Sequence, residues 1–259
     1  MTDQLTLEVI HNVPLIRSGD DLSVIITNAL SDNGMVLRDG DILVLAQKIV
    51  SKATGCFVDL KKVTPSQRAL ELAKETEKDP RLVEVILTES KSVIRKAPGI
   101  LITEHRLGWI MANAGIDASN VKADAGDDTI LLLPQAPDKF CEELREQLRV
   151  HLNIDVGVLI NDSFGRPWRV GTTGVALGAA GLTSLWDQRG ETDLFGRELK
   201  VSQQAIGDEL AAAASLLQGQ GAEGKPVILV RGLKLGVSTK PPSSPAGDLI
   251  RNASEDLFR

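Results

Sequence analysis

The sequence predicts an α+β fold rather than a doubly wound sheet. Apolar runs typical of strands occur along its whole length, yet helical segments fall between them without a strict strand–helix–strand alternation. At 259 residues with 42% hydrophobic content, the chain is long enough to bury one large core or two modest ones. We therefore expect mixed sheets with helices packed around them.

Strands are expected where Val, Ile and Leu alternate with polar residues or run together between polar and glycine residues. Seven segments have this pattern. They lie at about residues 5–10, 41–46, 100–103, 108–112, 129–133, 156–161 and 227–231. The segment 156–161 is apolar up to Asn161, which is typical of a strand buried on both faces.

Capping residues mark two helices in the first half of the chain. The clearest start is expected at Thr64, where Thr can cap, Pro65 suits the first helical position and Gln67 occupies the capping-box position. A second helix is expected to begin at Asp79-Pro80 and to turn its apolar residues inward. Both helices precede the predicted strand at 100–103.

Two further helices are expected in the second half. Apolar residues recur at helical spacing from Phe140 to Leu152, and an Ala-rich segment from about 203 to 218 ends at Gly219. These stripes are typical of helices that face a core. The segment 240–245 contains three prolines and is expected to be a loop.

Composition excludes several classes of protein. The 29 basic and 35 acidic residues give a net charge of -6, opposite to the basic surface of a nucleic-acid binder, so no nucleic-acid partner is expected. Cys56 and Cys141 lie far apart without a zinc or redox spacing. The start lacks a signal-peptide pattern, and no apolar run approaches the roughly 18 to 20 residues of a membrane span. We expect a cytoplasmic protein without a membrane partner.

A glycine-rich stretch from Gly219 to Pro226 superficially matches the dinucleotide fingerprint and most of a Walker A pattern. Both motifs need a strand before the loop and a helix after it, whereas here the helix comes first. Pro226 also replaces the Ser or Thr that would hold magnesium. A Rossmann or P-loop fold is therefore not expected, and the glycines fit a helix-to-strand turn as well as a phosphate loop.

Two acidic positions suit a divalent cation. A buried-type strand runs straight into Asp162 and Ser163, before an expected turn at 164–167. A carboxylate at a rigid strand end beside a hydroxyl suits a hard cation bound to phosphates. The segment 113–120 surrounds Asp117 with small and amide side chains. Each acid taken singly also fits a capping or turn role, but two carboxylates brought together by folding repel unless a cation lies between them.

Polar and basic side chains follow the same strand ends. Gln47, Lys48 and Lys52 come after the strand at 41–46, and Arg166 and Arg169 come after Asp162. Arginine suits bidentate contact with phosphate or carboxylate, whereas lysine acts as a point charge. Solvated surface charge is the alternative interpretation of these residues.

Several motifs occur together in a fixed order. They are VPLI at 13–16, SGDDL at 18–22, IVSKA at 49–53, NAGIDASNV at 113–121, LLP at 132–134, DS at 162–163 with GR at 165–166, DLFGREL at 193–199 and VRGL at 230–233. Over essentially its whole length the chain thereby resembles the coenzyme F420-0 gamma-glutamyl ligase family. NAGIDASNV and DLFGREL are long and specific enough to make a chance match improbable.

The resemblance implies an architecture and a reaction. The fold would be a two-lobed mixed α/β-sheet ligase fold, with residues 1–259 forming a single ligase unit of two intertwined α+β lobes and no appended reductase domain. Family members are homodimers. The activity would be a GTP-dependent addition of L-glutamate to coenzyme F420-0, followed by extension of a gamma-linked oligoglutamate tail.

The resemblance also implies the ligands of particular residues. GTP would be held by Val13, Pro14, Leu15, Ile16, Gln47, Lys48, Lys52, Asn120, Gln218, Gly219, Gln220, Gly221, Ala222, Glu223, Gly224 and Lys225. Two Mg²⁺ or Mn²⁺ ions would be held by Asp117, Asp162, Ser163 and Gln220, with K⁺ assisting. Gln220 stands where some relatives carry Glu, so the second cation is expected to be held less tightly unless Glu223 contributes.

The mechanism that follows is an acyl-phosphate one, with Lys52, Asp117, Asp162 and Arg166 as the catalytic residues. Two alternatives remain open, namely a regulatory protein that binds nucleotide without ligating and a ligase for another carboxylate acceptor.

The rings of the substrates also need stacking partners. Trp109, Trp168 and Phe164 are the candidates, and core packing is expected for at least two of them.

Overall fold

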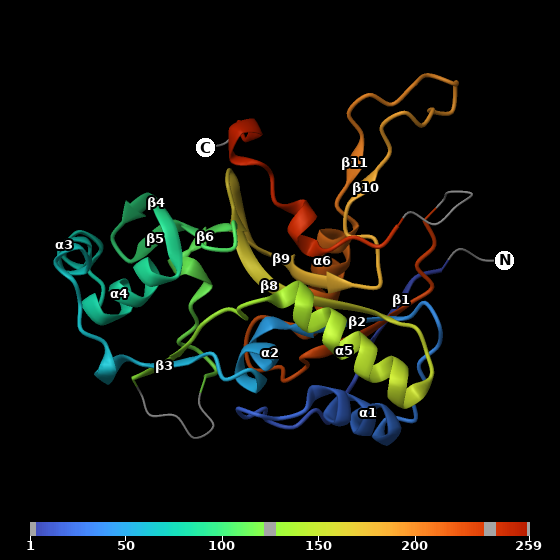
Figure 1. The fold of residues 1–259 in the computed structure, drawn as a ribbon, viewed down its shortest axis with the longest axis horizontal. Coiled ribbons are helices and arrows are strands. Elements are labelled where there is room, and N and C mark those ends of the chain that lie inside the picture. Colours follow the sequence, from blue (N-terminus) through green and yellow to red (C-terminus); the bar gives the residue numbers. More distant parts are fainter. Residues whose placement is uncertain (1–3, 122–127, 236–241, 258–259) are drawn as a thin grey trace.

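The computed structural model describes residues 4–121, 128–235 and 242–257 and confirms an α+β fold (Figure 1). Its main sheet has five strands in the order β1-β12-β2-β8-β9. β2 and β8 are parallel, whereas the other neighbouring pairs are antiparallel, so the sheet is mixed rather than doubly wound. The strands are β1 (Thr6–Val9), β12 (Val227–Arg231), β2 (Ile42–Ala46), β8 (Gly157–Arg166) and β9 (Arg169–Ala180).

The two faces of this sheet are covered by different helices. Leu43 and Leu45 of β2 belong to one buried cluster with α1, α2 and α5, while Ile42 and Val44 belong to another with α6. Successive residues of a strand point to opposite faces, and this alternation separates the two cores. The helices are α1 (Leu22–Asp32), α2 (Gln47–Ala53), α5 (Pro137–Leu152) and α6 (Ile206–Gln218).

A second, three-stranded sheet lies to one side of the main sheet (Figure 1). Its own buried cluster includes Leu72, Ile86 and Leu101. The elements are α3 (Gln67–Thr76), α4 (Pro80–Thr88), β4 (Ser90–Ala97), β5 (Ile100–His105) and β6 (Ile110–Ala112). Two sheets with separate cores are compatible with two lobes, and the division of residues 1–259 into intertwined lobes stays a prediction.

Shorter elements complete the fold. Two strand pairs are antiparallel, β3 with β7 and β10 with β11. The remaining elements are β3 (Phe57–Asp59), η1 (Leu60–Lys62), η2 (Asn113–Gly115), β7 (Thr129–Leu131), β10 (Trp186–Asp187), β11 (Gln203–Gln204), η3 (Ala246–Leu249) and η4 (Ala253–Glu255). The β10–β11 arm projects from the body of the molecule (Figure 1).

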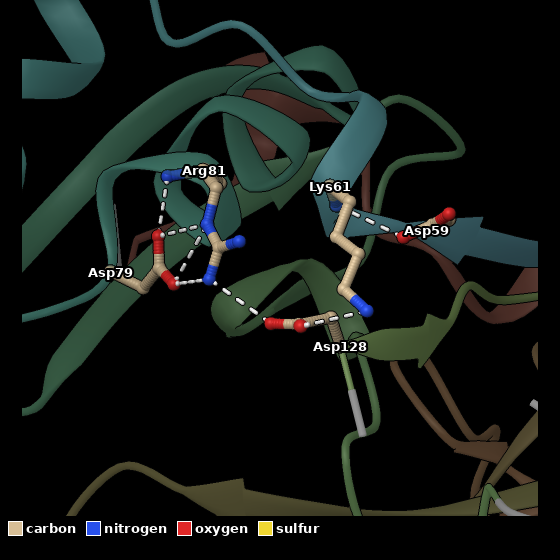
Figure 2. A network of polar contacts seen from close by, with 5 residues as sticks. All are labelled: Asp59, Lys61, Asp79, Arg81 and Asp128. Carbon is tan, nitrogen blue, oxygen red and sulfur yellow. Dashed lines mark hydrogen bonds and ion pairs between the residues drawn. The ribbon is translucent and has the colours of Figure 1, made fainter. Parts of the chain in front are cut away.

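A polar network joins β3, α4 and the start of β7 (Figure 2). Arg81 Nη2 lies 2.6 Å from Asp79 Oδ2 and 3.2 Å from Asp128 Oδ1. Lys61 Nζ lies 3.7 Å from the other oxygen of Asp128. Because these side chains are about a third exposed or more, the network orients three elements but contributes little stability.

A buried ion pair joins β12 to the turn before β2. Arg231 donates from Nε and Nη2 to the two oxygens of Asp41, at 2.8 and 2.6 Å. Asp41 is almost completely buried and also accepts from the backbone nitrogen of Arg38. This arrangement satisfies the carboxylate fully, as a buried charge requires.

All seven predicted strands and all four predicted helices are present, but three details of the prediction were wrong. The cap of α3 is Ser66, whose side chain accepts from the backbone nitrogen of Ala69, and not Thr64. The turn expected at 164–167 is displaced, because antiparallel pairing with β9 extends β8 through Arg166. The Ala-rich helix starts at residue 206 because the preceding glutamines pair with β10.

Residues 240 and 241 of the expected loop lie outside the described residues, and residues 242–245 contain no helix or strand, as predicted. Within the three described ranges, no helix combines the length and the apolar character needed to cross a bilayer.

Candidate functional site

A cavity of about 670 Å³ opens where β2 ends and α2 begins. β2 and β8 are adjacent and parallel, with Ala46 opposite Asn161. Gln47 and Asp162, the next residue in each segment, therefore reach the same edge of the sheet. The parallel pair thus brings the α2 side chains and the Asp162 carboxylate to one cavity.

The cavity gathers most of the residues that the sequence singled out. Those that line it are Val13, Pro14, Leu15, Ile16, Gln47, Lys48, Lys52, Asp117, Asn120, Asp162, Ser163, Gln218, Gly219, Gln220, Gly221, Ala222, Gly224 and Lys225. These residues come from five separate segments of the chain, and only folding brings them together.

Asp117 is positioned by backbone pairing and by a lysine. Its N–H and C=O exchange hydrogen bonds of 2.9 Å with Leu131. Just before it, Ala114 and Gly115 have positive φ angles of 53° and 68°, so the chain turns sharply into the cavity. The Nζ atom of Lys48 lies 2.8 Å from Asp117 Oδ1. The carboxylate therefore has a fixed direction and one charged partner.

The two carboxylates lie in an environment that opposes their ionisation. Burial and, to a lesser extent, the negative charge of Asp117 raise the pKa of Asp162 to about 6, although Lys48 acts against the shift. Burial also raises the pKa of Asp117, although Lys48 and Lys52 act against this shift. Burial lowers the pKa of Lys52, and the positive charge of Lys48 adds to that effect. Such opposed shifts in a cleft are typical of a functional site.

Buried polar atoms without hydrogen-bond partners are concentrated in this cavity. Among the described residues these atoms include Gln47 Oε1, Asp117 Oδ2, Asn161 Oδ1 and Gln218 Nε2, and all four residues line the cavity. Asn161 Nδ2 donates to the Ala211 carbonyl at 3.2 Å, which fixes the orientation of this amide and leaves its Oδ1 as the atom without a partner. Leaving buried polar atoms unpaired costs free energy, so such atoms point to a ligand or ion.

Three of these atoms are oxygens, the ligands that hard divalent cations prefer. Within the described ranges, however, no group of three or more His, Cys, Asp or Glu side chains is arranged to hold a metal. A cation between Asp117 and Asp162 would therefore also need hydroxyl, amide or phosphate oxygens. The residues present fit a cation that is bound together with a phosphate ligand.

The glycine-rich loop after α6 closes one side of the cavity. Lys52 Nζ donates to the backbone oxygen of Asn120 at 2.7 Å, and Asn120 Nδ2 donates to the oxygen of Gly221 at 3.1 Å. Gly219 has a φ of 75°, a left-handed conformation that favours glycine. The loop connects a helix to a following strand, as predicted, and is tied to α2 through Asn120.

The structure does not bring every predicted residue into the cavity. Arg166 is exposed at the end of β8 and is not among the residues that line the cavity. The Glu223 side chain also lies outside it and accepts instead from the backbone nitrogen of Gly221 at 2.8 Å. Asp162 and Ser163 lie within β8 rather than at its end, because β8 continues to Arg166. DLFGREL lies on the projecting β10–β11 arm.

Sequence reasoning missed several residues that line the cavity, among them Asn161 and Thr172. Asn161 is buried on β8, and its Nδ2 also donates to Gln218 Oε1 at 2.8 Å. A polar residue in an otherwise apolar run was the available indication. Thr172 lines the cavity from β9, and its hydroxyl lies 3.5 Å from Gln220 Oε1. It was missed because β9 itself was not predicted.

The fold and the cavity together define an α+β protein with a polar site suited to a cation and an anionic ligand. Residues 11–232 match the family described as F420-0:Gamma-glutamyl ligase. The chain is 45% identical to the coenzyme F420:L-glutamate ligase of Methanopyrus kandleri, over 96% of this chain and 97% of that protein. It therefore belongs to the F420-0:gamma-glutamyl ligase family.

Other relatives agree with this assignment. The protein of the same name from Methanothermobacter thermautotrophicus is 44% identical over 98% of this chain and 99% of its own length. That from Archaeoglobus fulgidus is 36% identical over 96% and 94% of the two chains. The family resemblance inferred from the motifs is confirmed.

Proposed function

We propose that this protein is a GTP-dependent ligase that adds L-glutamate to coenzyme F420-0 and extends a gamma-linked oligoglutamate tail. Family membership and the names of its relatives support the ligase reaction. The nucleotide part rests on one observation, the convergence of two lysines, two carboxylates and unpartnered buried oxygens in a single cavity. Such a set suits a phosphate chain bound together with a cation.

Amide formation from a carboxylate requires activation, because a carboxylate at neutral pH is a poor electrophile. In the proposed reaction an oxygen of the acceptor carboxylate attacks the γ-phosphorus of GTP, and GDP leaves. The amine of glutamate then attacks the acyl carbon, phosphate leaves and the amine loses a proton. The protein would mainly hold the reactants in line and neutralise the developing charge.

Particular residues suit these tasks. Lys52 and Lys48 project into the cavity from α2, where their charges can neutralise phosphate oxygens. Asn120 and the loop from Gly219 to Lys225 would hold the rest of the nucleotide, together with residues 13–16, which also line the cavity. Arg166 would have to move to contact phosphate, since it is exposed and does not line the cavity.

The proposed cations are two Mg²⁺ or Mn²⁺ ions, assisted by K⁺. Asp117, Asp162, Ser163 and Gln220 would hold the divalent ions, and all four line the cavity. When bound, these ions would polarise the phosphoryl group and neutralise its charge. Asp117 Oδ2 is buried without a partner in the described structure, so it presents a ready ligand atom even while Lys48 occupies Oδ1.

We propose that the protein works in the cytoplasm and that its working form is a homodimer. The β10–β11 arm supports the dimer, because Leu194 and Phe195 near its tip are almost fully exposed. Large apolar side chains on a projecting arm suit contact with another chain. Sedimentation of the purified protein would measure the assembly directly.

The test of the activity is mass spectrometry of the deazaflavin product after incubation with GTP, glutamate and Mn²⁺. We expect product masses increased by one or more glutamyl groups and stoichiometric release of GDP. GDP release without a glutamylated product would instead support a regulatory nucleotide-binding protein. Extension of a folate or peptide carboxylate, with no change in the deazaflavin, would support a different acceptor.

The role of Asp162 is tested by Asp162→Asn, which should lose most ligase turnover while remaining folded. Asp208→Asn is the matched control, because Asp208 is a carboxyl whose pKa burial also raises but which lies outside the main cavity. It should keep near-normal turnover. Near-normal turnover of Asp162→Asn in saturating Mn²⁺ would contradict the proposed metal role.

A further inference from the structure

The three aromatic residues that were candidates for ring stacking differ in their exposure to solvent. Trp109 and Phe164 are each only 8% exposed and belong to the main core cluster, and of these two only Phe164 also contributes to the lining of the cavity. Trp168 is 82% exposed. An aromatic side chain can stack on a ligand only if a face of its ring is accessible, and of the three rings that of Trp168 is the most exposed to solvent.

Trp168 lies on the turn of the β8–β9 ribbon, immediately beyond the cavity. Gly165 and Thr172 are opposite each other on the two strands, and both line the cavity. The next pair along the ribbon is Arg166 opposite Arg169, and the turn follows. Trp168 is three residues from Gly165 and therefore lies at most about 11 Å from a residue that lines the cavity, because an extended chain spans at most about 3.6 Å per residue.

The turn breaks local rules of stability in two ways. Trp168 has a φ of 58°, a left-handed conformation that is unusual and unfavourable for a bulky residue. Arg166 and Arg169 are like charges directly across an antiparallel pair, which is also destabilising. Departures of this kind from local rules are often found at functional sites.

We propose that Trp168, flanked by Arg166 and Arg169, forms the subsite that binds the aromatic ring system of the acidic acceptor substrate. This inference rests on the proposed ligase function and names the part of the site that would select the acceptor. The indole would stack on the ring, and the two guanidinium groups would attract the anionic acceptor. Arg166, which is outside the cavity, thereby has a role at its rim.

The length of the β8–β9 ribbon limits which acceptors can reach both the turn and Asp162. Asp162 and Arg166 are four residues apart on β8, a separation of about 13 Å at ~3.3 Å per residue. An acceptor whose carboxylate reacts near Asp162 and whose ring lies on Trp168 must span roughly that distance. Only an acceptor with a linker between ring and carboxylate can satisfy both ends, so the turn would discriminate against compact acids.

The variants Trp168→Ala and Trp168→Phe test this subsite, with Val170→Ala as the matched control. Val170 is a fully exposed apolar residue on the same ribbon and does not line the cavity. We expect Trp168→Ala to raise the KM for the deazaflavin acceptor on the order of tenfold, the usual effect of losing one stacking contact. Trp168→Phe should recover most of the loss, and the KM for GTP should not change.

Fluorescence gives an independent readout of binding. The other two tryptophans, Trp109 and Trp186, are buried, so quenching by iodide reports mainly on Trp168. The acceptor alone should protect Trp168 from iodide in the wild-type protein and in Val170→Ala. Because Trp168 is exposed on a turn, its replacement should leave the melting temperature unchanged or slightly raised.

Several results would overturn the proposal. An unchanged acceptor KM in Trp168→Ala would do so, as would an equal rise in the KM for GTP or an equal effect of Val170→Ala. A shift of assembly state in sedimentation, with the acceptor KM unchanged, would instead show that the turn contacts a second copy of the chain. If the wild-type protein neither binds nor glutamylates the deazaflavin, the proposed function fails as well.

Discussion

The carboxyl of Asp162 should destabilise the metal-free protein at neutral pH. Its pKa is about 6 in the folded chain, compared with an ordinary value of 3.8. An acid whose pKa is higher in the folded chain than in the unfolded chain favours folding less as it ionises. The protein therefore loses stability as the pH rises from the lower pKa to the higher one. At 1.36 kcal/mol per unit the full effect is about 3 kcal/mol above pH 6, and it is absent below about pH 4.

Asp162→Asn removes that ionisation and should stabilise the metal-free protein at pH 8. We expect the free energy of unfolding to rise by about 1–3 kcal/mol. The rise is smaller than the full effect of ionisation because burying the polar amide of Asn also costs free energy. Urea unfolding of both proteins in EDTA at pH 8 and at pH 5 measures the difference. The gain should shrink at pH 5, where the wild-type carboxyl is mostly protonated.

Addition of Mn²⁺ should reverse the order of stability at pH 8. An ion that binds only the folded state stabilises it in proportion to the logarithm of its concentration. The wild-type protein should gain stability with each increase in Mn²⁺, and Asp162→Asn should gain much less. The reasoning fails if the variant is less stable than the wild type in EDTA by the same amount at both pH values.

Three further predictions concern residues around the site and in the core. Asp41→Ala should lower the free energy of unfolding by about 3 kcal/mol, because it leaves Arg231 without its bidentate partner. Urea unfolding measures this loss, and an unchanged midpoint would show that the ion pair contributes nothing to stability. Gly174→Ala should lower the melting temperature clearly, since its Cβ would lie 2.3 Å from the Ala211 carbonyl oxygen, and an unchanged melting temperature would show that α6 shifts freely. Gln220→Glu should tighten Mn²⁺ binding severalfold in calorimetry, because it adds a third carboxylate to the cavity, and equal affinity would show that Gln220 is not part of the proposed metal site.

Much of the secondary structure was predictable because its determinants are local. The apolar runs of β2, β8 and β12 identify buried strands, and Asp79-Pro80 correctly marks the start of α4. Proline at the first helical turn and a capping aspartate act within a few residues, so no tertiary information is needed. The long strand β9 was missed for the opposite reason. Its many Gly, Ala and Thr residues carry little apolar periodicity, and pairing with β8 makes it a strand.

The small residues of β9 make sense only in the folded protein. Gly174 and Gly178 lie against the backbones of Ala211 and Pro137, where a Cβ would come within 2.3 and 2.5 Å of the nearest backbone atom. Helices on both faces of β9 therefore approach closely, which requires glycine at these positions. The sequence shows the glycines, but not the two helices that demand them.

The sequence by itself determined the α+β class, the apolar strands, the family and the residue types of the site, because motifs and periodicity are written along the chain. Tertiary structure alone decided how those residues meet. Parallel pairing of β2 with β8 brings Lys48 to Asp162, and the bridge to Leu131 brings Asp117 beside them. Folding also excluded Arg166 from the cavity and left Trp168 at its rim. These contacts are made between residues that lie far apart in the sequence, so no local pattern could specify them.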